Sequence, residues 1–135
     1  MAKRVFEING HDFDTLEGFY DEIGRKVLDD SSWGRNLDAF NDVLRGGFGT
    51  PEEGFVLRWL NSDRSQSALG FPATTRYLEE KVRRCHPSNV DDVRADLESA
   101  LRGEGQTLFQ ILVEIIRTHG PGGEEEDDGV ELELA

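Results

Sequence analysis

Apolar residues recur at helical or strand spacing along most of the chain. Helical spacing predicts helices over residues 15–28, 37–44, 72–85, 88–101 and 107–119. β-prone runs predict strands over residues 4–8 and 55–60, and apolar alternation predicts a third over residues 130–134, with Glu131 and Glu133 facing outward. Residues 61–67 are polar and are expected to form a loop. A helix between the first two strands favours a parallel crossover, and so an α/β fold.

The predicted helix over residues 37–44 has one apolar and one polar side. Asn36 is suited to cap its first turn, and Gly46 follows where a helix usually stops. The apolar side is expected to face the core and consists of Leu37, Phe40, Val43 and Leu44. The polar side consists of Asp38, Asn41, Asp42 and Arg45.

Two carboxylates on that polar side are close neighbours. Asp38 and Asp42 are four residues apart, a spacing at which like charges destabilise a helix by roughly a few tenths of a kcal/mol. An unfavourable local choice of this kind suggests a functional surface. The alternative interpretation is a solvated face on an acidic protein.

The last third of the chain combines a very apolar helix with an acidic run. The helix predicted over residues 107–119 is apolar on most of its surface, so it must be covered by other elements. Five consecutive carboxylates follow at residues 124–128 and are expected to be solvated. The alternative to a third strand over residues 130–134 is a disordered acidic tail.

Charge and composition restrict the class of partner. The formal net charge is −13, and residues 124–135 contain seven acidic residues and no basic one. A nucleic-acid-binding protein needs basic surface, so direct binding to RNA or DNA is not expected. An acidic surface is better suited to a basic protein.

No stretch approaches the roughly 20 apolar residues of a membrane span. With Cys85 as the sole cysteine and no signal-peptide pattern at the N-terminus, we expect a cytoplasmic protein.

Searches for catalytic and metal-binding patterns find no convincing site. His11, His86 and His119 lie in different predicted segments, and each is interpreted as a surface or loop histidine. Asp38 and Asp42 could form a general acid–base pair, but no third catalytic group lies near them in the sequence. We therefore expect no enzyme activity, no cofactor and no metal.

Three blocks of residues stand out along the chain: Ile8-Asn9-Gly10 after the first strand, Trp33-Gly34-x-Asn36-Leu37-Asp38-Ala39 with Asp42, and Val56-Leu57-x-Trp59. In their order and spacing, these blocks resemble the barstar family of intracellular ribonuclease inhibitors. The resemblance covers residues 4–60 and, more loosely, 107–134. It implies a small three-stranded parallel sheet packed by several helices. We expect a single barstar-like domain over residues 1–135, with an extended helical segment at 61–106 and an acidic loop at 121–129.

The resemblance also implies where a partner binds. In the family, the central helix and the loop before it block a ribonuclease active site, and helix carboxylates take the place of substrate phosphates. The partner-binding surface expected here comprises Ser32, Trp33, Gly34, Asn36, Asp38, Asn41, Asp42 and Gly46. Three family aromatics are replaced, by Ser32, Asn41 and Gly47, which implies a partner other than barnase itself.

These observations predict an immunity protein that inhibits a cognate ribonuclease or nuclease toxin with a basic active site. When free, it is expected to be a monomer. The alternative is an interaction module that uses the same fold to bind a protein that is not a nuclease.

Overall fold

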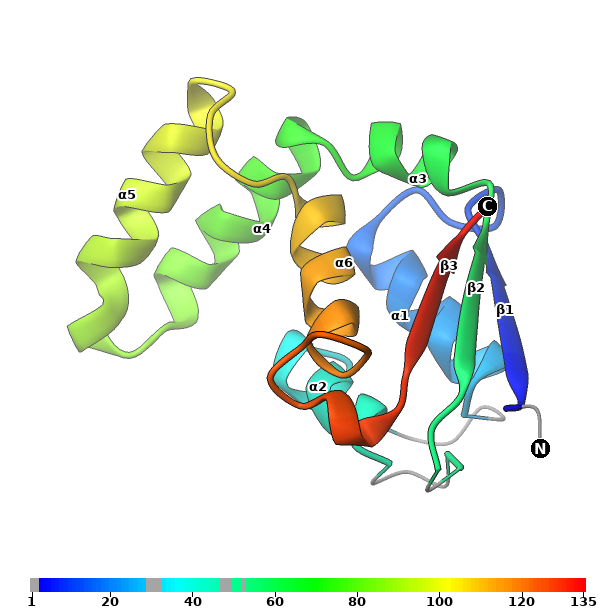
Figure 1. Cartoon of the computed structure of the whole chain (residues 1–135). Helices are drawn as coiled ribbons and strands as arrows, with labels where there is room; N and C mark the ends of the chain where they lie inside the picture. The colour runs from blue at the N-terminus through cyan, green and yellow to red at the C-terminus, as the bar shows by residue number, and fades with distance from the viewer. Residues whose placement is uncertain (1–2, 29–32, 47–49, 52) are drawn as a thin grey trace.

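A computed structural model describes residues 3–28, 33–46, 50–51 and 53–135. Within these residues, a three-stranded sheet and six α-helices form an α/β fold (Figure 1). The strands are β1 (Val5–Asn9), β2 (Val56–Leu60) and β3 (Glu131–Leu134). The helices are α1 (Leu16–Lys26), α2 (Leu37–Leu44), α3 (Ser62–Ala68), α4 (Phe71–Arg84), α5 (Val90–Leu101) and α6 (Leu108–Thr118), with short 3-10 turns η1 (Pro87–Asn89) and η2 (Glu126–Asp128). The predicted fold class is confirmed.

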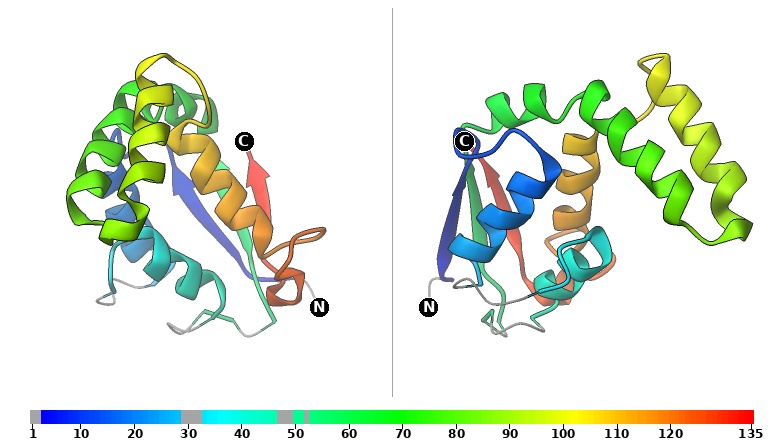
Figure 2. Two further views of the ribbon diagram at one scale, coloured as in Figure 1. Left: turned by 90° about the vertical axis from the view of Figure 1, so that its left-hand side faces the viewer. Right: turned by 180° about the vertical axis from the view of Figure 1, so that it is seen from behind.

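The sheet is parallel and has the order β1-β2-β3. Figure 2 shows the helices gathered on one side of it. On the other face, Glu7, Arg58 and Glu133 lie in register across the three strands. The Arg58 guanidinium donates to Glu7 at 3.2 Å and to Glu133 at 2.8 Å. A row of paired charges therefore crosses the open face, and Glu133 faces outward as the predicted third strand requires.

The core lies between this sheet and the helices. Trp59 of β2 is fully buried, and its ring stacks on Phe19 of α1 at 5.4 Å and contacts Phe109 of α6 at 5.2 Å, measured between ring centroids. Phe40 of α2 meets Phe19 edge-on at 5.3 Å. Aromatic pairs of this geometry add to the stability that comes from burial alone. One aromatic cluster thus joins β2 to α1, α2 and α6.

The segment between β2 and α6 is helical and partly stands away from the sheet (Figure 1). Helices α4 and α5 pack against each other around a small core of their own, formed by Leu78, Val93 and Ala100. That residues 1–135 constitute one domain stays a prediction.

The expected loop at residues 61–67 is wrong, because Ser62–Ala68 form helix α3. This helix has no apolar stripe that a sequence pattern could reveal. Its one buried residue is Ser65, whose hydroxyl accepts a hydrogen bond from the Trp59 indole N–H at 3.0 Å. The backbone N–H of Ser62 donates to Ala135 at 2.9 Å. Tertiary hydrogen bonds rather than hydrophobic periodicity hold this helix in place.

The third strand is confirmed, and the alternative of a disordered acidic tail is wrong. β3 pairs with β2 from Glu131 to Leu134, and both of its glutamates are exposed. Residues 124–128 are described and include η2. Across the described part of the chain, no helix is both long enough and apolar enough to cross a membrane.

Candidate partner-binding surface

Helix α2 is capped and anchored as its sequence predicts. The Asn36 side chain accepts a hydrogen bond from the backbone N–H of Ala39 at 2.7 Å, which satisfies one of the free donors of the first turn. Gly46 follows the helix with φ +94°, a left-handed conformation that favours glycine. Phe40, Val43 and Leu44 are buried, so one face of the helix is fixed in the core.

The two predicted carboxylates lie on the opposite face. Asp38 and Asp42 are both exposed, and the Asp42 side chain keeps 58% of its surface in contact with solvent. Tyr77 of α4 lies near Asp38: burial raises the pKa of the Tyr77 phenol, and the negative charge of Asp38 adds to the rise. The extended helical segment thus reaches the edge of this surface.

The loop before α2 is held by close packing. The half-buried Trp33 ring meets Tyr20 edge-on with ring centroids 5.6 Å apart. Gly34 is exposed, but a Cβ atom there would lie 2.8 Å from the Ala39 Cβ, so a larger residue would push the loop away from α2. The Asn36 amide also donates to the Gly34 carbonyl at 3.2 Å. Trp33, Gly34 and Asn36 therefore form one compact entry to the helix.

Two of the positions discussed in the sequence analysis cannot be placed. Ser32, expected in the partner-binding surface, lies outside the described residues, as does Gly47. The role of every predicted site residue in binding stays a prediction.

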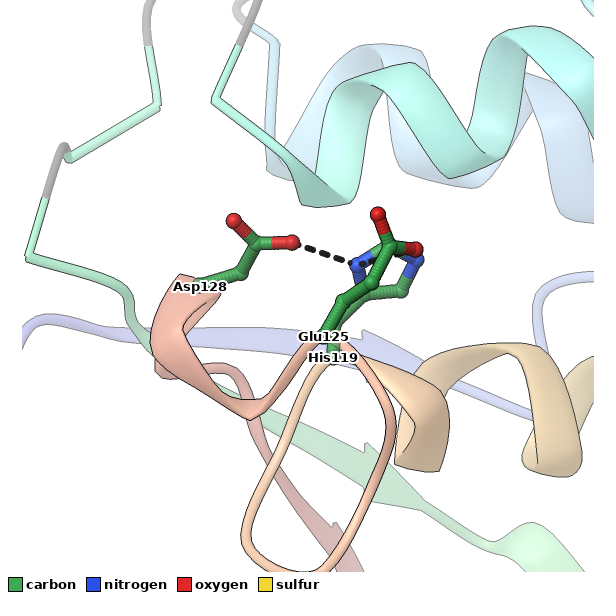
Figure 3. A group of neighbouring side chains, drawn as sticks. All are labelled: His119, Glu125 and Asp128. Carbon is green, nitrogen blue, oxygen red and sulfur yellow. Dashed lines mark hydrogen bonds and ion pairs between the residues drawn. The ribbon is translucent and has the colours of Figure 1, made fainter.

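Asn41 is turned toward His119, which the sequence was interpreted to place on the surface or in a loop. His119 does lie in the turn after α6, at the helix C-cap, but its side chain is fully buried, so a surface position is wrong. Its Nε2 lies 2.9 Å from the Asn41 Oδ1, and its Nδ1 lies 2.7 Å from the Asp128 Oδ2 (Figure 3). Both ring nitrogens therefore have an oxygen partner, and the buried ring bridges Asn41 of α2 to Asp128.

Arg45 makes a second connection between α2 and the same segment. Its Nε and Nη2 donate to the two Glu125 carboxylate oxygens at 2.9 and 3.1 Å, and its Nη1 donates to Asp42 Oδ1 at 3.1 Å. The hydrogen bonds between the two groups hold the pKa of the Glu125 carboxyl below its usual value and raise the pKa of the Arg45 guanidinium. Two sets of hydrogen bonds therefore connect α2 to the acidic loop. One runs from Asn41 through His119 to Asp128, and the other joins Arg45 to Glu125.

His119, Glu125 and Asp128 are also the residues best placed to hold a cation. Their potential ligand atoms all lie within 4.8 Å of one another. Each group already has a protein partner, and the 2.7 Å between Nδ1 and the Asp128 oxygen is the length of a charge-assisted hydrogen bond. These hydrogen bonds account for the grouping of the three side chains. Sequence reasoning missed the group because positions 119, 125 and 128 do not follow a helical metal-ligand spacing.

Comparison with known proteins identifies the family of the chain. A family model described as "Barstar (barnase inhibitor)" matches residues 3–131. No curated protein matches the chain. The resemblance seen in the three sequence blocks is confirmed.

Proposed function

Because the chain belongs to the barstar family, whose model is described as a barnase inhibitor, we propose that it is an immunity protein against a cognate ribonuclease or nuclease toxin. It places the acidic face of α2 and the preceding loop in the active site of that enzyme, in the cytoplasm. The observation that supports this proposal is the exposure of Asp38 and Asp42 on a helix whose other face is fixed in the core. The proposed contacts are Ser32, Trp33, Gly34, Asn36, Asp38, Asn41, Asp42 and Gly46.

The charges fit a nuclease active site. An enzyme that cleaves RNA binds phosphates with arginine and lysine side chains, and carboxylates can pair with the same cations. The net charge of −13 also speeds the encounter with a basic enzyme. Asp38 and Asp42, one helical turn apart, present two negative charges to such a site.

The packing supports rigid presentation. Phe40 lies against Phe19, the Asn36 cap closes the first turn, and Asn41 is bonded to a buried side chain. A helix that is already held in its binding conformation loses less conformational entropy when the complex forms. The unfavourable pair of like charges is therefore compatible with a stable helix.

The partner differs from barnase in its contact chemistry. Asn41, which stands where the family has tryptophan, bonds to His119. Aromatic residues dominate the energetics of many interfaces, so losing them alters which partner is preferred. We infer that the partner shares the basic active site of such nucleases but not the surface around it.

The test measures inhibition of RNA cleavage by a panel of purified basic ribonucleases that includes barnase. The wild-type chain inhibits at least one enzyme of the panel in a one-to-one complex. Asp42→Asn and Asp38→Asn each weaken that complex, and Asp42→Asn does so by about 2–5 kcal/mol because it leaves a buried cation of the enzyme unpaired.

The matched control is Asp91→Asn, since Asp91 is an exposed aspartate in the first turn of α5. It makes the same change in charge on a different helix and leaves inhibition unaltered. Inhibition that survives both α2 substitutions would remove the proposed mechanism. A partner captured through α2 that lacks nuclease activity would favour an interaction module instead.

A further inference from the structure

Arg45 is shared unequally between two carboxylates. Glu125 accepts two parallel hydrogen bonds from the guanidinium, whereas Asp42 accepts one through Oδ1. A bidentate fork is the stronger arrangement for arginine and a carboxylate. The position of Arg45 is therefore set mainly by Glu125, and most of the Asp42 side chain remains exposed.

Glu125 is itself held in place by the segment around it. Its backbone N–H donates to the Thr118 carbonyl at 2.9 Å. Gly123 lies so close to α6 that a Cβ atom would be 2.3 Å from that same carbonyl oxygen, so a side chain at this position would displace the loop. Downstream, Asp128 bonds to the buried His119 at 2.7 Å. Glu125 thus lies between two anchored points of the loop, and Figure 3 shows its side chain beside those of His119 and Asp128.

We propose that Glu125 is a positioning residue for Asp42: it retains Arg45, so that the Asp42 carboxylate stays available to the cations of a nuclease. This inference rests on the proposed function of α2. Two carboxylates and one guanidinium leave one negative charge at this end of the helix. Without Glu125, the guanidinium is free to form both of its parallel hydrogen bonds with Asp42, and the pair becomes neutral.

Arg45 then competes with the cations of the enzyme for the Asp42 carboxylate. A cation of the enzyme must displace the single Arg45–Asp42 hydrogen bond, and Glu125 offers the displaced guanidinium a partner that remains after the complex has formed. The acidic loop therefore affects affinity through Arg45, and Glu125 needs no contact of its own with the enzyme.

The first experiment observes the free protein. In ¹⁵N NMR spectra, the Arg45 Nε–H is expected to be protected from exchange with water in the wild type, because it donates to Glu125. Glu125→Gln removes the charge and one of the two acceptor oxygens, so the guanidinium turns toward Asp42, and both the chemical shift and the exchange rate of the Arg45 Nε–H change. A wild-type Nε–H that exchanges as fast as that of Arg94, an exposed arginine of α5, would overturn the proposal without any partner.

The second experiment is a double-mutant cycle, with affinity measured for the ribonuclease of the panel that the wild type inhibits most strongly. Glu125→Gln weakens binding by roughly five- to tenfold. Arg45→Gln strengthens it by roughly two- to fivefold, because the competitor is gone. In the double variant, Glu125→Gln has no further effect. Glu124→Gln is the control, since it removes the same charge from an exposed neighbour in the loop.

The outcomes separate the two proposals. If Glu125→Gln weakens binding equally with and without Arg45, Glu125 acts through its own contact or field, and the positioning role is wrong while the proposed function stands. An equal loss from Glu124→Gln would likewise overturn it in favour of general electrostatic attraction. If no enzyme of the panel is bound, both proposals fall.

Discussion

Replacing His119 by leucine tests how firmly α2 is attached to the segment after α6. The side chain is fully buried and joins Asn41 to Asp128 through hydrogen bonds of 2.9 and 2.7 Å. Leucine fills part of the volume but makes neither bond. The substitution therefore removes one connection between the proposed binding helix and the acidic loop.

The expected cost follows from these two bonds. A hydrogen bond to a charged group contributes about 1.5–3 kcal/mol to stability, and a bond to a neutral group about 0.5–1.5 kcal/mol. The Asp128 side chain is 26% exposed and Asn41 is half-buried, so both recover some contact with water when the ring is lost. We expect His119→Leu to lower the free energy of unfolding by about 2–4 kcal/mol.

The assay is urea unfolding followed by the fluorescence of Trp33 and Trp59. His11→Leu is the matched control because His11 is exposed, and it should change the free energy of unfolding by less than about 0.5 kcal/mol. A His119→Leu variant as stable as this control would refute the reasoning.

A companion substitution tests which way the hydrogen bonds run. Asn41→Asp keeps an oxygen facing the His119 Nε2, so a donating N–H retains its acceptor and gains a charged one. We expect no loss of stability. A clear loss, of about 1 kcal/mol or more, would count against a donating Nε2 atom, because repulsion from the neighbouring Asp38 costs only roughly a few tenths of a kcal/mol.

Two further predictions concern α1. Gly24→Ala should stabilise the protein by up to about 1 kcal/mol, because alanine favours the helix and its Cβ would lie 3.5 Å from the Trp33 Nε1, an ordinary contact. Gly18→Ala should destabilise the protein, because its Cβ would lie 2.8 Å from the Phe13 Cβ. Thermal melts of both variants measure the two effects. Burial raises the pKa of the Tyr20 phenol, so its contribution to stability is present below the ordinary tyrosine pKa of about 10 and is lost as pH rises through the folded value. Tyr20→Phe should therefore reduce the loss of stability measured in urea titrations above about pH 10, and an unchanged alkaline profile would count against the assignment.

The elements around the site could be predicted because their signals are local. Asn36, the apolar spacing through Leu44 and the glycine at position 46 define α2 within a dozen residues, and the structure places its cap and its buried face as expected. The alternation that ends at Leu134 likewise predicts β3. Helix α3 escaped prediction because Ser65, its one buried residue, is polar. A polar residue inside a helix is accommodated by a hydrogen bond to a partner in another element, here Trp59 of β2, and hydrophobic periodicity does not reveal such a bond.

By itself, the sequence determined the fold class, the family and the two outward carboxylates Asp38 and Asp42, because periodicity and short motifs act between neighbours in the chain. Only the tertiary structure brought His119 beneath Asn41 and Glu125 against Arg45, pairs that are 78 and 80 residues apart. Such pairs depend on the packing of α6 beside α2, which no local pattern encodes. Whether a charge in the acidic loop is free or paired is therefore decided by the packing of the whole chain.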